Sequence, residues 1–253
     1  MDNILYILLT QAVCLISFVA FIVLITYHIA KKKAFKLGSY IVLIVCVVGM
    51  YLFVPSNLLY LGLAYQQPEY LEKAIKLSIN PYEKRLAYKY ISEAYADDIL
   101  HQGIKDGNKA IEYMEKALKG EYKKYQGEAT MLAYWYSIKG DYDKTIELNK
   151  VLGQTKGISL RNIYIMNNEY EKALETFSDN NKSIDCFLKS ALYREIGDNK
   201  KAEEAIKEAR EGYDHIITSN GEEWIKVNAE KYKSIDAYKN WIRQQQKEYK
   251  FIN

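Results

Sequence analysis

The amino-acid sequence predicts an all-α protein, in which a two-helix transmembrane hairpin precedes a domain of helical repeats. Three observations lead to this fold class. Two long uncharged apolar runs stand near the N-terminus, on either side of a short Lys-rich loop. The rest of the chain is rich in Ala, Glu, Lys and Leu and the whole sequence holds only three Pro, a composition typical of helices. A pattern of small and aromatic residues also recurs five times.

The first two expected elements are transmembrane helices, at about residues 4–29 and 37–54. Residues 4–27 carry no charge and would form about 36 Å of helix, enough to cross a hydrocarbon core with some tilt. Residues 37–54 would form about 27 Å, which is just sufficient. A cleaved signal peptide fits less well, because the positive residues follow the first apolar run instead of preceding it.

The loop at residues 30–36 predicts the orientation of the chain in the membrane. Four Lys lie in it, and no other positive residue occurs before Lys73: Lys31, Lys32, Lys33 and Lys36. Positive loops stay in the cytoplasm. We therefore expect the N-terminus and the large C-terminal part to be extracytoplasmic.

Charge and cysteine content exclude two classes of protein. Residues 1–64 hold four Lys and one Asp, and so account for the whole formal net charge of +3. The neutral remainder offers no basic patch for nucleic acid. Of three Cys, only Cys186 lies beyond the two apolar runs, so the sequence predicts no disulfide framework.

The repeated pattern is a small residue, an aromatic residue three positions later, a polar turn, and then Ala or Thr. In four of the five copies the Tyr and the later small residue are nine positions apart, and in the second copy they are fifteen apart. Successive Ala or Thr positions are 36, 35, 28 and 29 residues apart. Periods of this length predict stacked helical hairpins. The residues expected to pack in this way are Gly62, Tyr65, Ala74, Tyr95, Ala110, Ala133, Tyr136, Thr145, Tyr164, Ala173, Tyr193 and Ala202.

The turns between these helices carry the residues that end and begin helices. Gly140, Gly197 and the pair Asn167-Asn168 can end helices in the left-handed conformation, and Asp or Asn can cap the helix that follows. Pro55 is expected to end the second span, so that a new helix over 55–66 opens the first repeat, although this segment could also be the tail of the span.

Four segments resemble the tetratricopeptide repeat family: LGLAY at 61–65, NKAIEYMEKAL at 108–118, GDYDKT at 140–145 and EYEKA at 169–173. The resemblance covers residues 56–212 and implies an α-solenoid that binds proteins. The chain departs from the family pattern in its short third and fourth repeats, in Arg161 at a position expected to be small, and in Pro81, which cuts the second helix of the first repeat.

These patterns divide the chain into a hairpin at 1–54, a repeat domain of about five helical pairs at 55–212 and capping helices at 213–253. In the last region we expect helices at 221–232 and 234–249, with Ser234 as a cap and Trp224 and Trp241 on apolar faces.

No catalytic motif is present, so we expect no enzymatic activity and no cofactor. Glu93, Asp97 and His101 are spaced to share one helix face and could hold a metal, but a solvated face explains them more simply. Cys186 is expected to be a small buried residue.

Four aromatic residues are candidates for a partner-binding concave face, with packing as the alternative: Tyr122, Tyr125, Tyr134 and Trp135. We expect a membrane-anchored, non-enzymatic scaffold that binds protein partners of a bacterial envelope. The alternatives are a structural subunit of a membrane complex and a membrane-bound immunity protein that sequesters a toxin.

Overall fold

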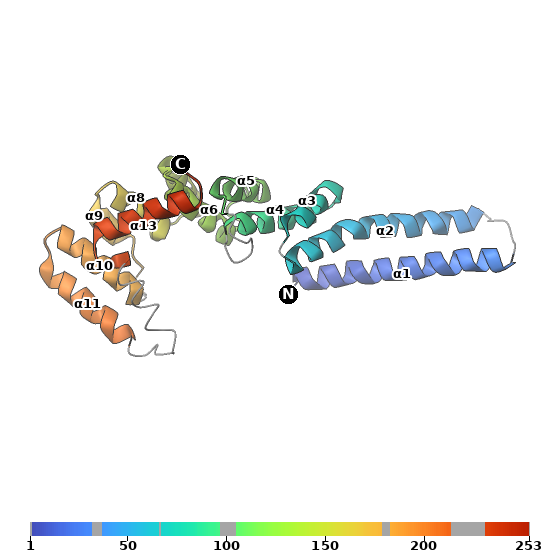
Figure 1. Ribbon diagram of the computed structural model, residues 1–253, viewed down its shortest axis with the longest axis horizontal. Helices are drawn as coiled ribbons and strands as arrows, with labels where there is room; N and C mark the ends of the chain where they lie inside the picture. The colour runs from blue at the N-terminus through green and yellow to red at the C-terminus, as the bar shows by residue number, and fades with distance from the viewer. Residues whose placement is uncertain are drawn as a thin grey trace. The chain divides into compact units, whose positions relative to one another are not determined.

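The computed structural model describes residues 2–31, 37–65, 67–96, 105–178, 183–213 and 231–252. Within these ranges the chain forms twelve α-helices and no β-strand, so the predicted all-α class is confirmed (Figure 1). The chain divides into two compact units. The first unit comprises residues 1–104 and 112–117, and the second comprises residues 105–111 and 118–253.

The first unit begins with two long antiparallel helices, α1 (Asp2–Lys31) and α2 (Leu37–Ala64). They approach closely where Gly49 faces Ser17, since a Cβ atom on Gly49 would lie 2.8 Å from the Ser17 Oγ atom. Near the loop end, the Nε2 atom of His28 lies 3.2 Å from the Oγ atom of Ser39. Small and polar side chains therefore hold the two apolar helices in register.

Helix α2 continues through Pro55 without interruption, so the prediction that a helix ends before this residue is wrong. Proline removes one backbone hydrogen bond from a helix interior. Here Pro55 and the side chains that follow it, Ser56 and Leu59, are buried, and this packing maintains the helix across the proline. The segment that was assigned either to the span or to the first repeat is thus part of the same helix as residues 37–54.

Helix α3 (Pro68–Leu77) folds back along the end of α2, and α4 (Pro81–Ala96) follows it. Leu71 of α3 packs directly on Gly62, where a Cβ atom would lie 2.5 Å from the Leu71 Cδ2 atom. The core between these helices is apolar and consists of Leu59, Leu71, Ala74, Leu86, Ala87 and Ile91.

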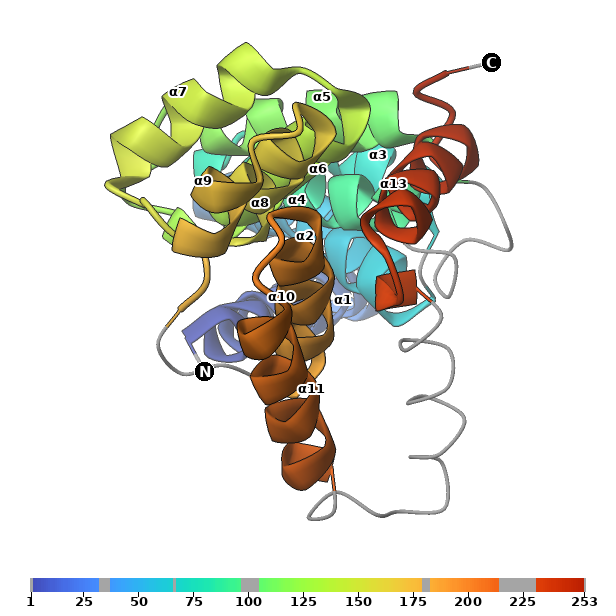
Figure 2. The ribbon, with the colours of Figure 1, turned by 90° about the vertical axis from the view of Figure 1, so that its left-hand side faces the viewer.

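The second unit contains three successive pairs of packed helices. They are α6 (Gln126–Lys139) with α7 (Tyr142–Leu152), α8 (Ile158–Met166) with α9 (Tyr170–Glu175), and α10 (Ser183–Glu195) with α11 (Asn199–Tyr213). Figure 2 shows α10 and α11 most clearly. Helix α5 (Gly107–Leu118) contributes residues to both units.

The turns within these pairs have the predicted conformation. Gly140, Asn168 and Gly197 all adopt positive φ angles, of 90°, 61° and 80°. The carboxylate of Asp141 accepts from the Lys144 backbone N–H at the start of α7, and Asp198 does the same at the start of α11. The short Gly-Asp and Asn-Asn motifs therefore place each second helix beside the first.

Helix α13 (Ile235–Glu248) begins at Ser234, whose Oγ accepts from the Ala237 N–H at 3.1 Å, as predicted. It packs on α6, α8 and α10, the first helices of the three pairs. In the described chain it contacts α10 of the last pair and makes no comparable contact with α11, and the expected capping role of residues 213–253 stays a prediction. The remainder of the predicted capping region, residues 214–230, lies outside the described residues, as does Trp224.

Candidate partner-binding surface

Most residues predicted to pack between helices are buried. Eight of them have little exposed surface: Gly62, Ala74, Ala110, Ala133, Tyr136, Thr145, Ala173 and Ala202. Three Tyr are partly buried: Tyr95, Tyr164 and Tyr193. Tyr65 is the exception, because 67% of its surface is exposed, which contradicts its predicted packing role.

Tyr95 belongs to an aromatic group in the first unit that connects three helices. Its ring stacks on Tyr113 of α5 with 5.9 Å between centroids, and the Tyr113 hydroxyl donates to Glu72 of α3 at 3.3 Å. Burial, with a further contribution from Glu72, raises the pKa of Tyr113 to about 12. The group thus links α3, α4 and α5 through neutral phenols.

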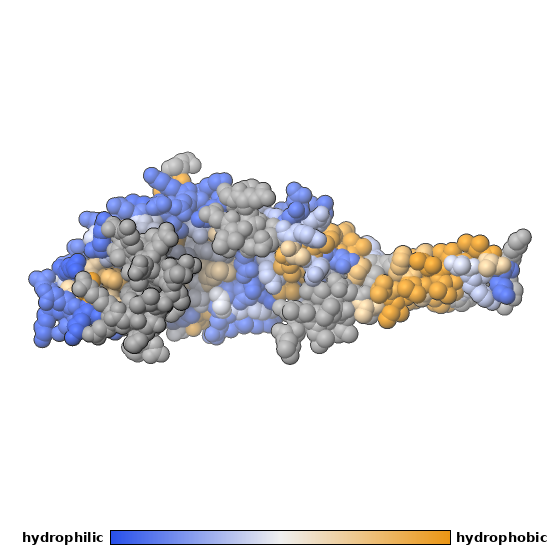
Figure 3. Space-filling view, turned by 60° about the horizontal axis from the view of Figure 1, so that its bottom comes forward, coloured by the Kyte–Doolittle hydropathy of each residue, from blue (hydrophilic) through white to orange (hydrophobic). Residues whose placement is uncertain are grey.

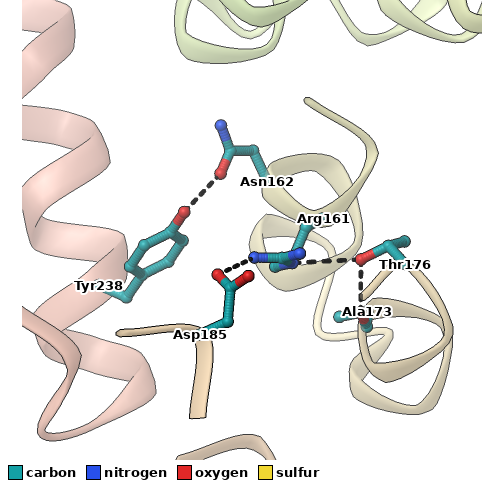
Figure 4. A network of polar contacts seen from close by, with 6 residues as sticks. All are labelled: Arg161, Asn162, Ala173, Thr176, Asp185 and Tyr238. Carbon is teal, nitrogen blue, oxygen red and sulfur yellow. Dashed lines mark hydrogen bonds and ion pairs between the residues drawn. The ribbon is translucent and has the colours of Figure 1, made fainter. Parts of the chain in front are cut away.

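Arg161, which occupies a repeat position where a small residue is expected, is buried in the second unit with 5% of its surface exposed. Its guanidinium donates to Asp185 of α10 at 3.0 Å and to Thr176 at 3.3 Å (Figure 4). It also lies 3.5 Å from the ring centroid of Phe177. Arg161 therefore connects α8 to α10 and to the end of α9, a role that the repeat pattern could not predict.

A second polar chain beside Arg161 holds α13 in place. The Tyr238 hydroxyl donates to Asn162 at 2.7 Å, and the Asn162 amide donates to Ser137 at 3.0 Å. Figure 4 shows Tyr238 reaching from α13 toward Asn162 on α8. All three side chains are fully buried, and burial raises the pKa of Tyr238 well above its ordinary value. Helix α13 is therefore part of the core.

The predicted aromatic surface is only partly formed. Trp135 is 5% exposed and Tyr134 packs against the core around α13, so neither presents a broad surface to a partner. Burial also raises the pKa of Tyr134 above the ordinary value. Tyr122 and Tyr125, between α5 and α6, are partly exposed. Trp135 is therefore a packing residue and not a binding residue. Tyr134 packs against the core on one side and is partly exposed on the other.

One edge of Tyr134 lines a cleft of about 490 Å³ between α6 and the segment that joins α7 to α8. Gly127, Thr130, Met131 and Tyr134 follow one another at helical spacing on a single face of α6. The opposite wall is formed by Gln154, Lys156, Gly157, Ile158 and Ser159.

The cleft combines apolar walls with a positive end. Met131 and the partly exposed Ile158 supply apolar surface, and Lys156 is exposed at the rim. No side chain caps the N-terminus of α8, where Gly157 has a φ of 136°. Helix N-termini favour negative charge. The cleft thus suits an apolar side chain next to a carboxylate. The wall on α6 could be predicted from helical spacing in the sequence. The opposite wall could not, because it comes from a segment that only the tertiary fold brings near α6.

Of the candidate metal residues, Asp97 and His101 lie outside the described residues. Glu93 on α4 forms an ion pair with Lys89, with 3.7 Å between the Lys89 Nζ and Glu93 Oε1 atoms. In the part of the chain that the structure describes, no three His, Cys, Asp or Glu side chains are grouped to hold a metal. Cys186 is buried, as predicted, and burial raises its pKa to about 11. Among the predicted loop lysines, Lys31 ends α1 and is exposed, whereas Lys32, Lys33 and Lys36 lie outside the described residues.

Comparisons of the chain with protein-family models, with curated proteins and with solved structures found no match.

Proposed function

We propose that this chain is a membrane-anchored, non-enzymatic scaffold that holds a protein partner on a TPR-like helical repeat domain outside the cytoplasm. One observation carries the membrane anchor. The described side chains of α1 and α2 are mostly apolar and exposed, as the hydrophobic surface in Figure 3 shows over this pair. Soluble proteins rarely expose contiguous apolar patches larger than a few hundred Å².

Helix α2 supports the anchor more strongly than α1. The stretch Ser39–Ala64 is long and apolar enough to cross a membrane, and only 19% of its most apolar window is buried. A core helix of a soluble domain would be mostly buried. The described apolar part of α1, Leu15–Lys31, is shorter. Its antiparallel packing against α2 favours a hairpin in which both helices span the bilayer.

The binding role is supported by the successive helical pairs and by the cleft beside α6. Helical repeats use such surfaces to bind extended segments or helices. Helix α13 packs on α6, α8 and α10, and the cleft lies between α6 and the segment that leads into α8. The proposed partner therefore presents an apolar side chain beside an acidic residue.

Site-specific photocrosslinking in intact cells tests this proposal. A photoreactive residue at Met131, in the cleft, should capture a discrete protein partner, and the same residue at Glu147, an exposed position on α7, should not. Equal capture at the two positions would remove the cleft from the proposal.

The orientation is tested with single cysteines and a membrane-impermeant thiol reagent, after the native cysteines are replaced. Lys150→Cys on α7 should react in intact cells and Lys33→Cys should react only after lysis. The reverse pattern would place the repeat domain in the cytoplasm.

A structural subunit of a membrane complex is the second candidate, because α13 packs across α6, α8 and α10 and so occupies surface that a partner would need. Exchange of residues 2–53 for an unrelated transmembrane hairpin in the same helical register distinguishes the two functions. A scaffold keeps its crosslinked partner after the exchange, and a subunit loses it.

A further inference from the structure

We infer that the turn between α3 and α4 is a second membrane contact. Its apolar residues lie in the lipid headgroup region beside the hairpin. This inference depends on the proposed membrane anchor and adds to it. The turn consists of Ser78, Ile79 and Asn80 and is followed by Pro81, the first residue of α4.

The depth of the turn follows from its attachment to α2. The Glu83 carboxylate is buried and accepts from the hydroxyl of Ser56 at 2.5 Å and from that of Ser78 at 2.6 Å. One carboxylate thus joins the turn to a defined level on α2. Because Gly62 contacts Leu71 while Ser56 is joined to Ser78, α3 runs back along α2 toward the hairpin loop.

Ser56 stands at the level where α2 leaves the bilayer. From Leu37 to Ser56 the helix extends by about 29 Å at 1.5 Å per residue. This length equals the hydrocarbon thickness of about 30 Å, so a helix that enters the bilayer near Leu37 leaves it near Ser56. The α3–α4 turn therefore lies at the far interface, whereas the end of α2 at Ala64 lies about 12 Å beyond it.

The surface chemistry of the turn suits this depth. Ile79 is 72% exposed, and Leu77 and Pro81 beside it are also exposed. Two basic residues flank them, the exposed Lys76 and the partly exposed Lys84. The next carboxylate in the sequence after the turn, that of Glu83, is buried and accepts hydrogen bonds from Ser56 and Ser78. Apolar side chains flanked by lysines are typical of segments that lie in the interface, where anionic lipids add attraction.

Depth-dependent fluorescence quenching tests the inference on the full chain. The protein is reconstituted in phosphatidylcholine vesicles with one quarter phosphatidylglycerol. An environment-sensitive fluorophore is attached to one cysteine at a time, at Ile79, Tyr65 or Val45, with the native cysteines replaced. Tyr65 is the matched control, since it is 67% exposed but directly follows the end of α2 at Ala64, about 12 Å beyond the level of Ser56. Val45, exposed on α2 within the span, reports the membrane anchor itself.

The label at Ile79→Cys should be quenched several-fold more strongly by a headgroup-level lipid nitroxide than the label at Tyr65→Cys, and less strongly by aqueous iodide. The label at Val45→Cys should be quenched by a nitroxide deep in the acyl chains. If Val45→Cys is lipid-quenched while Ile79→Cys and Tyr65→Cys respond alike, the anchor stands and the second contact is refuted. If Val45→Cys is not lipid-quenched, the anchor itself is wrong, and this inference fails with it.

Discussion

The buried ion pair between Arg161 and Asp185 makes the second unit sensitive to loss of a single charge. The guanidinium is almost fully buried, whereas 27% of the Asp185 side chain is exposed. Removal of one partner from a buried pair costs about 3–5 kcal/mol, and exposed pairs contribute about 0–1 kcal/mol. Because water reaches part of Asp185, we expect Asp185→Asn to lower the free energy of unfolding by about 2–3 kcal/mol.

Urea denaturation of the full chain in detergent, followed by tryptophan fluorescence, measures this change. All three Trp of the chain lie beyond residue 118, so their emission reports the second unit. With a urea dependence of about 1–3 kcal/mol per molar, the midpoint should fall by about 0.7–3 M. The control is Asp143→Asn, because Asp143 also lies in the first turn of a helix but is exposed.

A double variant identifies the cause of the loss. In Arg161→Met/Asp185→Leu both charges are replaced by apolar groups, so no charge is left uncompensated, and much of the stability should return. A midpoint for Asp185→Asn no lower than that of Asp143→Asn would refute the argument. A double variant as unstable as Asp185→Asn would show that lost packing, and not the uncompensated guanidinium, causes the effect.

Two further predictions concern close packing and a buried thiol. Gly62→Ala should destabilise the first unit by about 1–3 kcal/mol, because the added Cβ would overlap Leu71, and amide hydrogen exchange in α3 should accelerate. The control is Gly127→Ala on α6, which should change little because a Cβ there meets no atom within 4 Å. Cys186, studied with the other cysteines replaced, should react with an alkylating reagent at pH 8 about 100-fold more slowly than an ordinary thiol, because its pKa is raised from 9.0 to about 11. Its contribution to stability is complete below pH 9 and declines as the pH rises toward 11, and fast alkylation of the native protein would contradict its burial.

Local patterns were sufficient to predict the helices and their turns. The left-handed glycines Gly140 and Gly197 and the cap at Ser234 depend on the backbone preferences of a few neighbouring residues, and the structure has each as predicted. For the pair Asn167-Asn168 the sequence indicated a left-handed turn, and the structure assigns it to Asn168. The same reliance on local preference made the prediction at Pro55 wrong. A proline tends to end a helix, but the buried contacts around Leu59 outweigh that tendency and α2 continues.

The candidate binding surface was less predictable. Tyr134 and Trp135 are adjacent in sequence, but a helix turns about 100° per residue and sends their side chains in different directions. Which direction faces solvent depends on where α13 packs, and nothing in the sequence of α6 states that. The cleft likewise needs the segment after α7 to lie opposite Met131.

Composition and periods of a few residues are enough to indicate the helical class, the apolar character of the first two helices and the small residues at which helices approach. Only the packed helices show that α2 passes through Pro55, that α13 lies across α6, α8 and α10, and that Arg161 is buried against Asp185. These features join residues that are distant in the chain. A buried charge or hydroxyl must find a partner wherever the fold provides one, and that partner is known only when the helices have packed.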